Sequence, residues 1–137
     1  MSLHSAAFDY AKLKHNGQLY GDYPYICHLI GVEKIAYEFF GDVEHLSDIC
    51  YLHDIIEDTD ATFEELLELF GNVVATTVNI LTKKGEHRDI YIENIKASPL
   101  AHKCKVADTF YNLQESIKGN DMNRIRRYTN QLERLYK

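Results

Sequence analysis

The chain has 137 residues, of which 45% are apolar and 26% are charged, with only two prolines and seven glycines. This composition excludes a disordered or low-complexity chain, and the length predicts a single domain, residues 1–137, built around one core. A net charge of −6 argues against nucleic acid as a partner, because neutralising phosphates requires a basic face. A small anionic substrate is compatible with this charge if a cation and local basic groups offset it.

No apolar run is long enough to span a membrane, and the first residues lack the basic and apolar regions of a secretory signal. We therefore expect a cytosolic protein with no membrane partner. The three cysteines, Cys27, Cys50 and Cys104, show no CxxC spacing and lie in apolar helical patterns, which predicts buried, reduced thiols. The oligomeric state is left open, and a homo-oligomer is compatible with the sequence.

Helix start and stop signals divide the chain into about seven or eight helices with short connections, which predicts an all-α bundle. In the first half of the chain, His28 lies in line with Val32, Ile35 and Phe39 on one helical stripe. Its imidazole should therefore be buried or half-buried. Such a histidine is either a hydrogen-bonded core residue or a metal ligand. Gly41 is expected to end this helix.

Four ionisable residues interrupt the otherwise apolar segment 50–58: His53, Asp54, Glu57 and Asp58. On a continuous helix they fall within an arc of roughly 140°, opposite the apolar residues of the segment. Imidazole and carboxylate groups are the ligands expected for Mn, Fe or Zn ions, and an adjacent His-Asp pair can converge on one ion if other helices add ligands. The alternative is a solvated acidic helix face.

The second half of the chain carries clear helix boundaries. The segment Thr62–Glu65 predicts a capping box that opens a short helix ended by Gly71. Ser98-Pro99 predicts the start of a helix that runs to about Lys118. A last amphipathic helix is expected over residues 121–136.

On the helix that follows Pro99, Lys105, Asp108 and Asn112 gather on one face. The opposite face carries an apolar stripe that we expect in the core: Val106, Phe110, Leu113 and Ile117. The polar face is either a surface Lys-Asp ion pair or part of a site. Two histidines and two aspartates from three helices would complete a metal site in the centre of a helical bundle.

These segments together resemble the HD superfamily of metal-dependent phosphohydrolases, and within it the hydrolase domain of the RelA/SpoT alarmone enzymes and their small stand-alone forms. Residues 15–18 (HNGQ) and 24–28 (PYICH) resemble the family's HxGQ and PYxxH elements. Residues 52–59 (LHDIIEDT) resemble its LHDxxEDT motif, and residues 105–113 (KVADTFYNL) are similar to KLADxxxNL. The resemblance implies an HD-type helical bundle.

The resemblance also implies an activity, the Mn²⁺-dependent removal of the 3′-pyrophosphate from guanosine tetra- or pentaphosphate. The metal ligands it implies are His28, His53, Asp54 and Asp108. Glu57 and Asp58 would be the catalytic acidic pair, one of which takes a proton from a water activated by the ion. Asn112 would contact the nucleotide. Tyr128 either matches a family tyrosine that contacts substrate phosphate or is a half-packed aromatic residue.

The chain departs from the family at two positions that concern the substrate. Before the Pro-Tyr element the family carries basic residues, whereas this chain has Tyr20, which could stack on a base. Thr109 replaces the usual basic residue after the last aspartate. Lys105 is therefore expected to help hold phosphate groups, and other candidates for such contacts are Lys83, Lys84 and Arg88.

Three alternative functions remain open at this point. The altered base-contacting segment is compatible with another nucleotide or a nicotinamide dinucleotide phosphate as substrate. A second alternative is a catalytically silent nucleotide-binding module that has kept the fold. The third is a helical interaction module whose polar residues are only surface residues.

Overall fold

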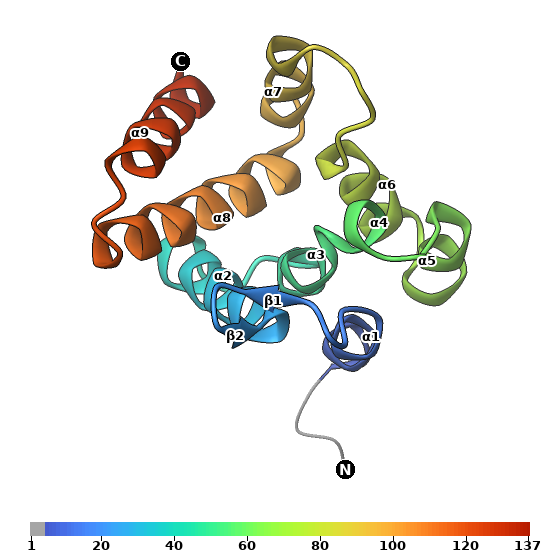
Figure 1. Cartoon of the computed structure of the whole chain (residues 1–137). Coiled ribbons are helices and arrows are strands. Elements are labelled where there is room, and N and C mark those ends of the chain that lie inside the picture. Colours follow the sequence, from blue (N-terminus) through green and yellow to red (C-terminus); the bar gives the residue numbers. More distant parts are fainter. Residues whose placement is uncertain (1–4) are drawn as a thin grey trace.

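The computed structural model describes residues 5–137, and helices account for nearly all of the regular structure in that range (Figure 1). The helices are α1 (Ala6–Lys14), α2 (Tyr25–Phe40), α3 (Leu46–Leu52), α4 (Ile55–Asp58), α5 (Phe63–Phe70), α6 (Asn72–Leu81), α7 (Arg88–Lys96), α8 (Pro99–Lys118) and α9 (Met122–Tyr136). The all-α prediction is confirmed, and eight of these helices exceed one turn, because α4 has four residues. None of the described helices has both the length and the apolar character needed to cross a bilayer.

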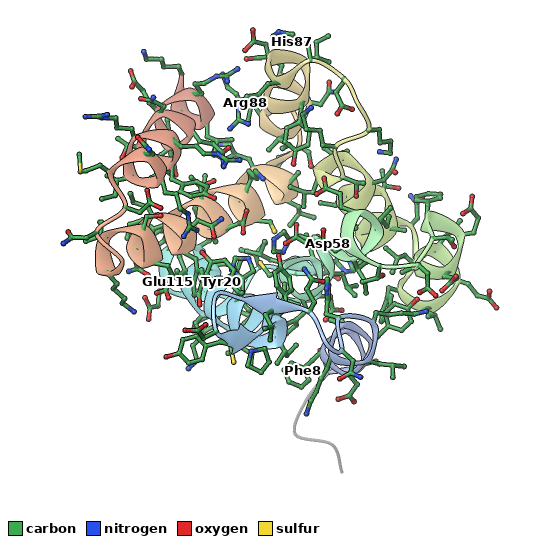
Figure 2. The ribbon with its side chains drawn as sticks, in the orientation of Figure 1. Phe8, Tyr20, Asp58, His87, Arg88 and Glu115 are labelled. Carbon is green, nitrogen blue, oxygen red and sulfur yellow. The ribbon has the colours of Figure 1, made fainter. Side chains whose placement is uncertain are left out.

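The region before α2 contains a short hairpin that the sequence did not predict. Strands β1 (Leu19–Tyr20) and β2 (Tyr23–Pro24) pair antiparallel, with Tyr20 opposite Tyr23. Gly21, in the turn between them, has a φ of 58°, a left-handed conformation that glycine adopts without steric cost. The hairpin holds Tyr20 next to α2 (Figure 2).

Helix α8 crosses the centre of the molecule, with α2 and α3 on one side of it and α7 and α9 on the other (Figure 1). It begins as predicted, because the Ser98 hydroxyl accepts a hydrogen bond from the Ala101 amide at 3.3 Å and Pro99 occupies the first turn. The predicted core stripe is wrong at its C-terminal end, since Ile117 is 57% exposed while Asp108 is buried. A helix enclosed on several sides has no single core face, so its polar face also lies inside the protein.

Other local predictions have mixed outcomes. The Thr62 hydroxyl caps α5 by accepting from the Glu65 amide, as expected. Cys50 and Cys104 are buried free thiols, but the prediction is wrong for Cys27, which is exposed. Cys27 lies on the side of α2 that faces solvent, whereas the next residue, His28, is buried.

Helices α2 and α8 approach each other closely at Gly31. A Cβ atom added at Gly31 would lie 2.7 Å from Cδ2 of Tyr111 on α8 and still closer to Cε2. We expect Gly31→Ala to destabilise the protein by about 1–3 kcal/mol, the usual cost of overpacking. Urea unfolding followed by circular dichroism measures this. Gly119→Ala is the matched control, because its Cβ would meet only the carbonyl oxygens of Glu115 at 3.4 Å and Ser116 at 3.9 Å, which are ordinary contacts. An equal loss of stability in both variants would contradict the explanation.

Candidate metal centre

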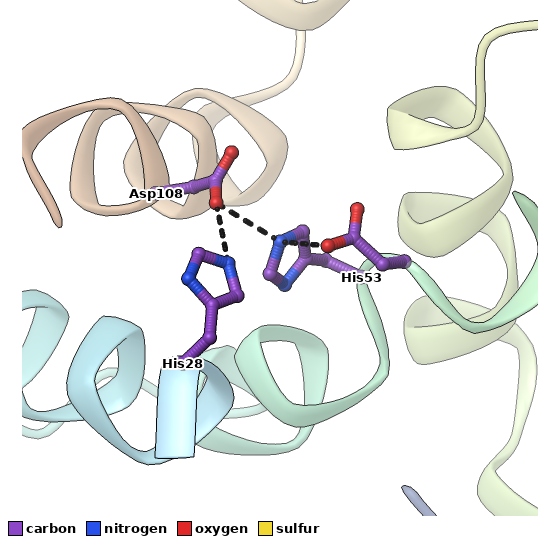
Figure 3. A group of neighbouring side chains, drawn as sticks. His28, His53 and Asp108 are labelled. Carbon is purple, nitrogen blue, oxygen red and sulfur yellow. Dashed lines mark hydrogen bonds and ion pairs between the residues drawn. The ribbon is translucent and has the colours of Figure 1, made fainter. Parts of the chain in front are cut away.

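Four side chains from three distant segments of the sequence meet beside α8 (Figure 3). His28 comes from α2, His53 and Asp54 from the junction of α3 and α4, and Asp108 from α8. Each offers one nitrogen or oxygen atom, and these four atoms lie within 4.8 Å of one another. The residues that the sequence selected as metal ligands are therefore brought together from three parts of the bundle.

His53 and Asp54 can face the same point because the helix is interrupted between them. A continuous helix was predicted across residues 50–58, but α3 ends at Leu52 and α4 begins at Ile55. Asp54 has φ −103° and ψ 1°, which lies in the sparsely populated bridge region of the backbone map. On a regular helix the two side chains would diverge by about 100°. The prediction of a continuous helix was wrong, and the break is what makes the pair converge.

The imidazole of His53 is oriented by the backbone. Its Nδ1 donates to the Cys50 carbonyl oxygen at 2.7 Å, so Nε2 points to the centre of the cluster. There it lies 3.1 Å from Oδ2 of Asp54 and 3.3 Å from Oδ1 of Asp108. Nε2 is buried and has no hydrogen-bond partner of suitable geometry among the described residues. A neutral imidazole would direct its lone pair at two carboxylates, an arrangement that needs a proton or a metal ion between them.

The close contact between His53 and the two carboxylates also shifts the pKa values of these groups. Burial alone would lower the pKa of His53, but the carboxylates of Asp54 and Asp108 raise it well above its usual value. Burial would likewise raise the pKa of Asp54, but His53 lowers it to about 2. A proton on His53 therefore takes the place of a cation. Two imidazole nitrogens and two carboxylates also form a donor set that suits a divalent transition-metal ion.

The groups around the cluster hold its aspartates in place. The Tyr25 hydroxyl donates to Oδ2 of Asp54, and Nε2 of His28 lies 3.0 Å from Oδ1 of Asp108. Lys105 lies 3.6 Å from Oδ2 of Asp108, and only 17% of its side chain is exposed. The alternative of a surface ion pair is therefore wrong, because both partners lie largely inside the protein.

The two acidic residues of α4 lie beside the cluster without belonging to its ligand set. Glu57 accepts a hydrogen bond from the Lys83 amide, and Asp58 accepts one from Nε2 of Gln18 at 3.0 Å. Burial raises the pKa of Glu57 above its usual value. A carboxylate with a raised pKa accepts a proton more readily than an ordinary glutamate, which is the property that a general base requires.

Tyr20 covers one side of the cluster. Its ring stacks on His28 with centroids 4.8 Å apart and planes 8° apart. Its hydroxyl donates to Oδ1 of Asn112 at 2.7 Å and accepts from Nη2 of Arg124 at 3.0 Å. The guanidinium of Arg124 also lies over the ring of Tyr128. Three residues selected from the sequence as substrate contacts therefore meet around one arginine.

Arg124 was missed in the sequence, and Lys84 was selected but lies elsewhere. Arg124 is one helical turn before Tyr128 on α9, a spacing that could have drawn attention to it. The ammonium of Lys84 instead donates to the carbonyl oxygens of Asn79 and Thr82, at the end of α6. The Asn79 carbonyl also accepts from the Thr82 amide, and Thr82 is the residue that follows α6, so the Lys84 ammonium adds hydrogen bonds at this helix end.

The relatives described here are proteins named for the hydrolysis of ppGpp. No protein-family model matches the chain. The guanosine-3′,5′-bis(diphosphate) 3′-pyrophosphohydrolase MESH1 of Danio rerio is 37% identical over 118 residues, which cover 78% of this chain and 65% of that protein. The human MESH1 is 36% identical, with 80% and 66% covered. The chain thus spans slightly less than two thirds of the length of these relatives.

More distant relatives extend the match along the chain. The bifunctional (p)ppGpp synthase/hydrolase SpoT of Escherichia coli is 31% identical over 90% of this chain and 20% of that protein. A solved structure of a metazoan SpoT ortholog that hydrolyses ppGpp superposes with a TM-score of 0.78 at 30% identity, covering 98% of this chain and 86% of that one. With this identity and coverage of both chains, the protein belongs to the SpoT-related family that includes this ppGpp-hydrolysing ortholog.

Proposed function

We propose that the chain is a metal-dependent phosphohydrolase that removes the 3′-pyrophosphate from guanosine-3′,5′-bis(diphosphate). The observation that carries the proposal is the buried cluster in which Nε2 of His53 faces the carboxylates of Asp54 and Asp108. The relatives named above as pyrophosphohydrolases support the same reaction. We further propose that residues 1–137 act as one domain in the cytoplasm, with Mn²⁺ as the native ion.

The proposed ligands are His28, His53, Asp54 and Asp108. When bound, a divalent ion would lower the pKa of a coordinated water and polarise a phosphoryl oxygen. Glu57, with its raised pKa, would take a proton from the attacking water, and Asp58 is the second acidic group of the pair.

The substrate contacts are proposed on the side of the cluster that Tyr20 covers. Arg124 and Asn112 both bond the Tyr20 hydroxyl, so a nucleotide that displaces this hydroxyl would gain a guanidinium and an amide at once. Lys105, beside Asp108, would offset the charge of a phosphate near the ion. Tyr128, next to Arg124, would complete this side of the site.

The test is an assay of pyrophosphate and phosphate release from ppGpp, GTP, GDP and NADPH, each with Mn²⁺ and after chelation. We expect Mn²⁺-dependent pyrophosphate release from ppGpp. Release from another substrate alone would retain the hydrolytic reaction and exclude the proposed substrate. Release from none of them, with ppGpp still bound, would favour a silent nucleotide-binding module.

Metal binding should also raise the thermal stability of the protein. An ion that binds only the folded state stabilises it by about 2.7 kcal/mol when present at 100 times its dissociation constant. We therefore expect Mn²⁺ to raise the melting temperature in differential scanning fluorimetry, and EDTA to reverse the rise. Asp108→Asn should respond much less. An equal rise of the melting temperature in Asp108→Asn would show that the ion binds outside the proposed ligand cluster.

A further inference from the structure

A cavity of about 550 Å³ lies between α7 and α9, and none of its lining residues belongs to the four-residue cluster. We call it the α7–α9 pocket. Four basic side chains line it, Arg88 from α7 and Arg127, Arg134 and Lys137 from α9 and the residue after it. Glu133 is the one acidic residue of the lining. This concentration of positive charge contrasts with the net charge of −6 of the whole chain.

Two of the four basic groups are neutralised within the protein. Arg134 pairs with Asp89, and Lys137 pairs with Glu133. Within residues 5–137, neither Arg88 nor Arg127 has a carboxylate partner. The guanidinium of Arg127 lies over the ring of Tyr128, 5.5 Å from its centroid. Two guanidinium groups without a counter-charge therefore line one cavity.

Arg88 is held in place by a chain of three hydrogen bonds, of which the one between Gln131 and Thr109 is buried. The Thr109 hydroxyl donates its one hydrogen to the Lys105 carbonyl oxygen at 2.7 Å, so it can only accept from Gln131, whose Nε2 lies 2.6 Å away. Oε1 of Gln131 must then face the other way, where it accepts from Nη2 of Arg88. Gln131 is only 7% exposed, and Thr109 is fully buried.

This arrangement leaves most of the Arg88 donors available to a ligand. A guanidinium has five N–H groups in a rigid fork, and the hydrogen bond to Gln131 engages Arg88 only through Nη2. Because the amide of Gln131 cannot rotate without losing its bond to Thr109, the fork is oriented before any ligand arrives. Figure 2 shows Arg88 at the start of α7, on the side that faces α9.

We propose that the α7–α9 pocket is a second anion site, which binds a phosphate group carried by a small molecule. Two unpaired guanidinium groups suit the charge and the several acceptor oxygens of a phosphate. The volume is in the range of small-molecule sites and exceeds that of a single ion. The phosphate belongs either to a separate ligand or, if the proposed function holds, to a distant part of the substrate.

The first experiment measures binding of inorganic phosphate and of pyrophosphate to the full chain by isothermal titration calorimetry, in EDTA and at constant ionic strength. EDTA removes any contribution from a bound metal ion, so the result does not depend on hydrolysis. We expect saturable binding that Arg127→Gln and Arg88→Gln each weaken about tenfold or more, through loss of charge-assisted hydrogen bonds. Arg127 is exposed, so its variant should fold normally.

Arg126→Gln is the matched control, because this exposed arginine precedes Arg127 on α9 and does not line the pocket. Unchanged binding in Arg126→Gln together with the loss in Arg127→Gln would support the site. Equal binding in all variants, or no saturable binding in the unmodified chain, would overturn it. With ppGpp as substrate, a raised KM at unchanged kcat in Arg127→Gln would identify the substrate as the source of the phosphate, and an unchanged KM a separate ligand.

Discussion

Asp54→Ala is expected to abolish ppGpp hydrolysis and metal retention together. Loss of a partner that only orients a metal ligand typically costs about 10- to 100-fold in metal affinity or activity, and loss of a ligand itself should exceed that. The change also removes the carboxylate that faces Nε2 of His53 at 3.1 Å and leaves the Tyr25 hydroxyl without its acceptor. Metal content after dialysis and pyrophosphate release from ppGpp measure the two effects.

Two further variants separate the loss of a ligand from damage to the fold. Asp54→Asn keeps an acceptor for the Tyr25 hydroxyl but removes the charge, so it should fold and still lose the ion. Asp60→Ala changes an exposed carboxylate just after this segment that pairs with Lys14, and it should keep both metal and activity. Full activity in Asp54→Asn would contradict the ligand assignment.

Glu57→Gln should lower kcat by about 10²- to 10⁴-fold, the usual contribution of a positioned general acid or base. Metal content should remain unchanged, since Glu57 is outside the ligand group. Glutamine preserves the shape of the side chain and the oxygen that accepts from the Lys83 amide, but it cannot take up a proton. Steady-state kinetics with ppGpp, beside metal analysis of the same preparation, measure this outcome.

Glu64→Gln is the matched control for this change, because Glu64 is an exposed glutamate in the first turn of α5. It should be indistinguishable from the unmodified protein. If Glu57→Gln retained full kcat, the proton acceptor would have to be sought in Asp58, and Asp58→Asn would then show the loss instead.

The elements that could be predicted from the sequence are those that local chemistry determines. Ser98 and Pro99 begin α8, and Thr62 begins α5, because a hydroxyl cap acts on amides two or three residues away. The helical pattern of each segment alone left a core residue or a surface pair open, so the convergence of His28 with Asp108 could be inferred only by taking the three segments together, and the family resemblance then supported it.

Tertiary packing determines what the sequence did not reveal. The interruption of the helix at His53 and Asp54 could not be predicted, because no glycine or proline occurs there. The burial of Lys105 depends on α7, whose Tyr91 ring lies 5.5 Å from the Lys105 ammonium. The contact between Tyr20 and Arg124 joins residues 104 positions apart, beyond the reach of any local pattern.

The separation of the proposed ligands along the chain has a kinetic consequence. His28 and Asp108 meet at 3.0 Å although they are 80 residues apart, so the cluster can form only after α2 and α8 have docked. An interaction that is absent from the folding transition state slows unfolding and leaves the folding rate almost unchanged. A bound ion would therefore slow unfolding. Chelation should shorten the lifetime of the native state without altering the rate at which the chain refolds.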